Sequence, residues 1–314
     1  MKRAGMLALA VLAAGQVWAA GFDGSRVSSG ATWVVHADLV ALRAMPLGQF
    51  VVNKLGSGDS GKKLAAFTVI VGCDPLKDLR TISLYGKSKD PAQSVFLAEG
   101  AFDTGRLVTL LQANDTYQSQ FYGTYTIHSW VDAKKAAEGR QYGCMHPSGT
   151  LLISRGRAML EEALDVLDGK RPTLDAAKAF GAELLASSFF MAGANVTAAG
   201  DLNPSAAILK QAESAQVALA AQGGELALRA RLTAKDGPAA SNMLAVAQGM
   251  LAVAQLGQEK HPELAHIAQA AQVRLDGVLL RIDLVYPETR VIALIEECMK
   301  TGACHAAGAP APTP

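Results

Sequence analysis

The sequence has no excess of either charge and few aromatic side chains. Lys plus Arg number 29 against 28 Asp plus Glu in 314 residues, and Phe, Trp and Tyr make up 6%. Without a basic excess, the chain lacks the electrostatic signature of a nucleic-acid-binding protein. Its 50% hydrophobic and 18% charged residues are typical of a folded chain. We therefore expect a globular body and no nucleic-acid partner.

Long apolar runs are confined to the N-terminus. Lys2 and Arg3 precede an apolar stretch at residues 6–14, and small residues follow near Ala19. This series is typical of a cleaved secretory signal, and it is shorter than the roughly 20 residues that span a bilayer. An uncleaved anchor is the weaker alternative. We expect cleavage after residue 19, a secreted or periplasmic protein, and no transmembrane segment in the mature chain.

Cysteine is scarce for a chain of this length. The four cysteines are Cys73, Cys144, Cys298 and Cys304. In an oxidising compartment an even count favours disulfides. Gly302 is suited to a left-handed helix stop that would turn Cys304 back towards Cys298. We therefore expect a local bridge between Cys298 and Cys304, which leaves Cys73 and Cys144 as the other pair.

Motifs for metal and cofactor binding are incomplete. His146 and His305 lie near cysteines, but the two close-spaced ligand pairs of a structural zinc site are missing. Glu263 and His266 share a helical face and form only half of a carboxylate–histidine site. We expect no metal and no cofactor.

The hydrophobic periodicity predicts an α+β fold built from two similar units. In residues 30–169 the order is strand, helices, two strands, helix, two or three strands, helix. After a linker and short helix at 170–187, the same order returns in 188–300. We expect each unit to be a mostly antiparallel sheet with helices packed on one face, related by internal duplication. The Ala/Pro-rich tail, 301–314, is expected to be disordered.

Several elements can be assigned from local signals. Residues 40–55 have helical spacing, and residues 122–130 alternate as one strand. Asp236 is placed to cap a long helix that carries Met243 and Met250.

Three segments resemble a group of secreted bacterial proteins that have no assigned activity. They are Trp-Val-Val-His-Ala-Asp at 33–38, Asp-Pro-Leu-Lys-Asp-Leu at 74–79 and Thr-Ile-His-Ser-Trp at 126–130. The resemblance covers nearly the whole mature chain and implies a secreted α+β protein. It implies no substrate and no catalytic residue.

The Gly-rich segment at 56–63 imitates two functional motifs. It has the glycines and Lys62 of a phosphate-binding loop, but Lys63 stands where the magnesium-binding Ser or Thr belongs. Ser60 imitates a hydrolase nucleophile in Gly-Asp-Ser-Gly and Ser-x-x-Lys contexts, without the partner motifs. We interpret the segment as a loop between helices.

His36 and Asp38 fall on one face of a predicted strand, and His128 falls on another strand. If those strands were neighbours, the three side chains would form a polar cluster. They are the weak binding-site candidates of this sequence.

No catalytic constellation is complete, so the leading hypothesis is a secreted, non-catalytic protein with a binding or structural role. Its partner would be a protein or a small apolar ligand. The alternative is a carrier of an apolar or lipid-like ligand, because Met243 and Met250 lie at helical spacing and methionine adapts to irregular surfaces. A lower alternative is a hydrolase, in which His36, Asp38 or His128 would have to meet a nucleophile in a cleft.

Overall fold

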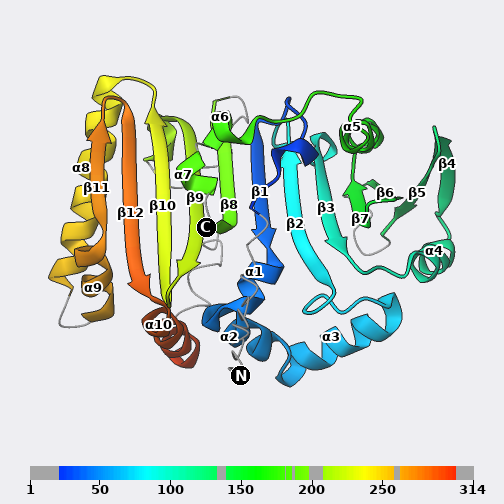
Figure 1. The fold of residues 1–314 in the computed structure, drawn as a ribbon, viewed down its shortest axis with the longest axis horizontal. Coiled ribbons are helices and arrows are strands. Elements are labelled where there is room, and N and C mark those ends of the chain that lie inside the picture. The colour runs from blue at the N-terminus through cyan, green and yellow to red at the C-terminus, as the bar shows by residue number, and fades with distance from the viewer. Residues whose placement is uncertain are drawn as a thin grey trace, which may run out of the picture.

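One antiparallel sheet organises the described part of the chain. The computed structural model describes residues 21–132, 139–180, 182–185, 188–197, 208–257 and 262–301. In these residues twelve strands form a single sheet in the order β11-β12-β10-β9-β8-β1-β2-β3-β7-β6-β5-β4. Figure 1 shows them side by side from β11 at the left edge to β4 at the right. The predicted α+β class is confirmed.

The strands are β1 (Trp33–Asp38), β2 (Leu79–Gly86), β3 (Ser94–Gly100), β4 (Gln118–Tyr122), β5 (Tyr125–Val131), β6 (Arg140–His146), β7 (Thr150–Ser154), β8 (Ser188–Asn195), β9 (Ala212–Gln222), β10 (Glu225–Ala234), β11 (Gln272–Asp276) and β12 (Leu279–Pro287). The helices are α1 (Leu39–Ala44), α2 (Pro46–Leu55), α3 (Gly58–Val71), α4 (Thr104–Gln112), α5 (Arg157–Leu167), α6 (Ala176–Phe180), α7 (Ala182–Leu185), α8 (Gly237–Leu256), α9 (Pro262–Ala270) and α10 (Glu288–Thr301). Short 3-10 turns are η1 (Gly24–Arg26), η2 (Pro91–Gln93) and η4 (Leu209–Gln211).

The strand order repeats on the two sides of the sheet's centre. Outward from β1 the order is β1-β2-β3-β7-β6, and outward from β8 it is β8-β9-β10-β12-β11. Helix α4 follows β3 where α8 and α9 follow β10, and α5 follows β7 where α10 follows β12. The hairpin β4–β5 belongs to the first half alone. The repeated element order agrees with the sequence pattern, while descent by duplication stays a prediction.

The two halves share one sheet, because β1 and β8 hydrogen-bond directly to each other. Val34 of β1 faces Gly193 of β8, where a side chain would not fit: a Cβ there would lie 2.1 Å from the ring of Phe180. A second link lies at the end of the sheet where α2 meets α10 (Figure 1). There the buried Glu288 carboxylate accepts the backbone N–H of Leu47 at 3.2 Å.

Alternation along the strands gives the sheet two distinct faces. We call the face of Val34 and Tyr85 the α5 face, because α5 packs against it. The opposite face carries Val35 and Leu84 and is covered at one side by α8, so we call it the α8 face.

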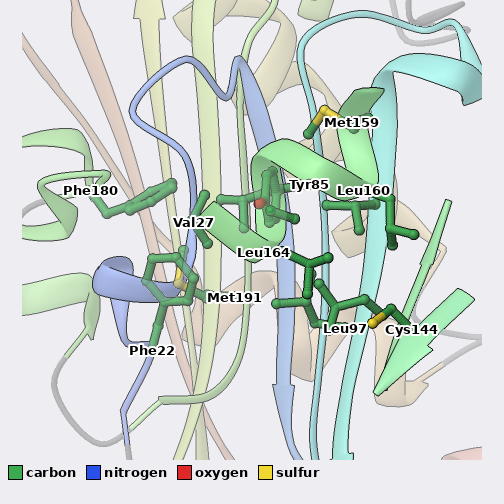
Figure 2. Close-up of a cluster of buried hydrophobic side chains, with 14 of the residues drawn as sticks. Phe22, Val27, Tyr85, Leu97, Cys144, Met159, Leu160, Leu164, Phe180 and Met191 are labelled. Carbon is green, nitrogen blue, oxygen red and sulfur yellow. The ribbon is translucent and has the colours of Figure 1, made fainter. Parts of the chain in front are cut away.

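The main core lies on the α5 face. Helix α5 contributes Met159, Leu160 and Leu164, which are at most 4% exposed. Figure 2 shows these side chains against Tyr85, Leu97 and Cys144 of the sheet. A smaller core on the α8 face joins α8 to β10 and β12 through Met243, Leu232 and Leu280.

The predicted helix at 40–55 is two helices. The chain breaks at Met45, whose extended backbone (ψ 155°) precedes Pro46, the first residue of α2. A residue before proline is disfavoured in the helical region, which explains the break. The predicted loop at 56–63 is wrong for most of its length: residues 56–57 separate α2 from α3, and residues 58–63 form the first turns of α3, which begins at Gly58. Lys62 is an exposed helical residue 3.4 Å from Asp59.

The predicted strand at 122–130 corresponds mainly to β5, but its first residues are the end of β4 and a turn. Strands β4 and β5 turn at Gly123, which has a left-handed backbone (φ 55°). Alternation continues through both strands, so the pattern alone hid the turn.

The predicted Cys73–Cys144 bridge is wrong, because both thiols are free and buried. Cys144 lies in β6 and packs in the α5-face core, whereas Cys73 follows α3. Burial raises the pKa of Cys144 to about 11 and also raises that of Cys73, so both remain protonated. Cys298 is disulfide-bonded. Cys304 lies outside the described residues, so its pairing with Cys298 stays a prediction.

Candidate functional site

The central groove is an apolar cavity of about 390 Å³ among β1, β8, β9 and β10. Its lining includes three small residues, Ala192, Ala194 and Ala230, together with Trp33 and Leu209. The Trp33 indole N–H donates to the carbonyl of Ser88 at 2.9 Å, so the polar atom of the ring is already bonded. The remaining lining residues are Val34, Val35, Gly193, Ala215, Gln216, Val217 and Leu232. This lining contains no charged side chain.

The groove belongs to a longer apolar row on the α8 face. From Val35, the cross-strand register runs through Leu84, Phe96 and Ile153 towards β7. In the other direction it runs through Ala192, Val217 and Ala230. All seven side chains are only partly buried. An interior sheet face of this composition would normally be covered completely.

The α4 cavity lies on the same face near the other end of the row and has a volume of about 250 Å³. Leucines and Val108 of α4 form one side, and Trp130, Met145, Leu151 and Ile153 of the sheet form the other. Thr104 and His128 are polar side chains in its lining, and Trp130 and Cys144 add an indole N–H and a thiol.

His36 lies on the opposite face from His128. Its Nδ1 is 2.8 Å from Ser83 Oγ, and its ring meets Phe22 edge-on at 5.4 Å between centroids. Among the described residues its buried Nε2 has no hydrogen-bond partner. Burial lowers the pKa of His36, while Asp38 raises it and Arg26 lowers it further.

The predicted cluster of His36, Asp38 and His128 is not formed. Asp38 is 2% exposed, and its carboxylate caps α1 by accepting the Ala41 N–H at 2.9 Å. His128 lies on β5, and β2, β3, β7 and β6 stand between it and β1. Only His128 lines one of the cavities described above.

His36 should make stability depend on pH. Its folded-state pKa lies below the unfolded value of about 6.5, so the unfolded chain binds more protons in acid. We expect full stability above pH about 6.5 and a loss of up to about 1.4 kcal/mol per pH unit as the pH falls below it. Urea unfolding of the wild type and His36→Gln between pH 7.5 and 5 measures this.

His128 also has a pKa lowered by burial and contributes with the same sign. His128→Gln therefore measures the separate contribution of His128 to the pH slope, and the double variant gives the remaining background. Identical pH slopes for the wild type and His36→Gln would contradict the prediction.

A Ser–His–Asp chain that the sequence analysis did not identify joins the β6–β7 turn to the end of α5. Ser148 Oγ lies 2.8 Å from His146 Nδ1, and His146 Nε2 lies 3.2 Å from Asp168 Oδ1. Lys170, Tyr125 and His146 hold the pKa of Asp168 at about 2. The same Nδ1 accepts the backbone N–H of Ser148 at 3.2 Å, so the ring caps the turn. These residues line neither the central groove nor the α4 cavity.

Glu263 and His266, the incomplete carboxylate–histidine motif, interact with other side chains. Glu263 accepts the Tyr286 hydroxyl at 2.6 Å and lies 3.8 Å from Arg290 and 3.4 Å from His266. Within the described residues, no group of three or more His, Cys, Asp and Glu side chains is arranged to hold a metal ion.

The methionine stripe on α8 divides into two environments. Met243 is fully buried against the sheet, whereas Met250 is 66% exposed. Neither lines the central groove. Among the described residues, α8 is the helix long and apolar enough to cross a membrane, although Ala240, Met243 and Ala247 pack it against the sheet.

Sequence reasoning identified His128 but missed the surfaces around it. Most of the groove residues lie in strands, as the sequence predicted, whereas Leu209 lies in the 3-10 turn η4. The missing information was which strands are neighbours and which of the two faces the described residues cover only in part.

Comparisons with known proteins give distant structural likeness only. A scan against protein-family models found no matching family, and a search of curated proteins found no match. Crystal form III of TP0453 aligns with a TM-score of 0.49 and 12% identity, covering 88% of this chain and 99% of that chain. Crystal form I gives a TM-score of 0.43 and 13% identity, covering 89% and 99%. Likeness at this level carries no functional information.

Proposed function

We propose that this protein is a non-catalytic, extracytoplasmic carrier that binds an apolar, lipid-like ligand on the α8 face of its sheet. The observation that carries the proposal is the partly buried apolar row on this face, which includes the central groove. The row crosses β10, β9, β8, β1, β2, β3 and β7. The N-terminal signal pattern supports the extracytoplasmic location.

The lining of the groove favours an apolar ligand over a polar one. A ligand with several polar groups would lose hydration there, because Gln216 is the lone polar side chain among the lining residues. An alkyl chain gains about 0.8 kcal/mol for each CH₂ that it buries. A volume of about 390 Å³ lies in the usual range for small-molecule sites.

The alanines in the lining of the groove offer a direct test. Ala192 is central in the row, between Val35 and Val217, so Ala192→Trp should fill the groove. We expect the affinity for the uncharged fluorescent probe N-phenyl-1-naphthylamine to fall at least tenfold, measured by titration. Native mass spectrometry of the wild-type protein, purified after export by its own host, should show bound lipid. The mass of the chain should correspond to cleavage after residue 19.

Ala158→Trp is the matched control, because Ala158 is exposed on α5 at the opposite face. It should bind the probe as the wild type does. Equal probe affinity in Ala192→Trp, Ala158→Trp and the wild type would overturn the proposal. Thermal melting of both variants separates filling of the groove from unfolding.

A further inference from the structure

The α4 cavity differs from the central groove because it has a polar anchor. His128 and Trp130 are two residues apart on β5 and therefore share the α8 face. Opposite His128 on β6 stands Gly143, where a Cβ would lie 3.2 Å from the Trp130 ring. The glycine thus allows Trp130 to lie against β6 while His128 remains in the cavity lining.

Tyr117 fixes the orientation of the His128 ring. The two rings stack with centroids 5.9 Å apart, and the Tyr117 hydroxyl lies 2.8 Å from His128 Nδ1. We assign the hydroxyl as the donor, which places the ring proton on Nε2. Burial lowers the pKa of His128, so the ring is neutral near pH 7 and Nε2–H is a single, oriented donor.

The apolar row leads from this donor to the central groove. In the register, His128 faces Gly143, which faces Ile153, and Phe96, Leu84 and Val35 follow. Five strand spacings of about 4.8 Å separate His128 from Val35, or about 24 Å in total. A long acyl chain can follow such a path.

We propose that the α4 cavity binds the carboxylate of a long-chain fatty acid, with His128 Nε2–H as the donor and the acyl chain along the row towards the central groove. The proposal rests on the carrier function and specifies its ligand. A carboxylate accepts strong hydrogen bonds from nitrogen donors, and no charged side chain lines the cavity to compete for it. The bound carboxylate would favour protonation of His128 at Nδ1, whose N–H would then donate to the Tyr117 oxygen, so binding should take up a proton.

The test compares a fluorescent fatty acid, cis-parinaric acid, with its methyl ester at pH 6.5. We expect the wild type to bind the acid at least tenfold more tightly than the ester. His128→Leu should reduce the affinity for the acid to that for the ester. Binding of the ester and of N-phenyl-1-naphthylamine should not change. Calorimetry in buffers of different ionisation enthalpy should detect proton uptake in the wild type and none in the variant.

His128→Gln is the second variant, because it retains an N–H donor without a titrating ring. It should keep part of the preference for the acid and lose the proton uptake. Equal affinities of acid and ester in the wild type would overturn the head-group assignment even if N-phenyl-1-naphthylamine still binds. Failure of the wild type to bind any of the three probes would instead overturn the carrier function.

Discussion

Replacing Leu164 by alanine is expected to lower the free energy of unfolding by about 2–5 kcal/mol. Leu164 is fully buried on α5, in the cluster that joins this helix to the sheet (Figure 2). The loss is the sum of the transfer free energy of the removed carbons and the free-energy cost of the cavity that they leave. The cavity persists because a close-packed core relaxes only partly. Urea unfolding followed by circular dichroism measures the change.

Val253→Ala is the control, because Val253 is 70% exposed on α8. It should change the free energy of unfolding by no more than about 0.5 kcal/mol. A loss below about 1 kcal/mol for Leu164→Ala would show that α5 is not held in the core as described.

Gly156→Ala is also expected to lower the stability of the protein strongly. The cause here is overpacking and not a cavity. A Cβ on Gly156 would lie 1.9 Å from the carbonyl oxygen of Ala92 in η2. Gly156 caps the N-terminus of α5, so relief of this clash requires α5 or η2 to shift from its packed position. We expect a loss of about 1–3 kcal/mol or more, visible as a lower melting temperature.

Gly237→Ala provides the comparison, because nothing lies within 4 Å of a Cβ at that helix start. It should melt close to the wild type. If both glycine variants melt alike, the close contact between α5 and η2 does not exist in solution.

The cysteine pairing shows why sequence spacing could not determine contacts. Cys73 and Cys144 were paired by elimination, but their parts of the chain meet different neighbours. Separation along the chain sets the entropy of closing a loop, whereas the disulfide requires a Cα–Cα distance below about 7 Å.

The candidate site was predicted only in part. The alternation that placed His128 on a strand face was a local signal and was correct. That this strand lies five positions from β1, with His128 under α4 and His36 on the other face, depends on the order of strands in the sheet. Strands that alternate equally well can be joined in several orders, so the local pattern did not reveal the groove.

By itself, the sequence determined the α+β class, most strand positions and several helix ends, because caps, turn glycines and side-chain periodicity act over a few residues. Asp236 illustrates this, since its carboxylate caps α8 as predicted by accepting the Ala239 N–H at 2.7 Å. Only the tertiary structure decided that both halves share one sheet through β1 and β8, and that the described residues cover the α8 face only in part between α8 and α4. Those features arise from contacts between residues far apart in the chain, whose free energy depends on the packing of all the strands together.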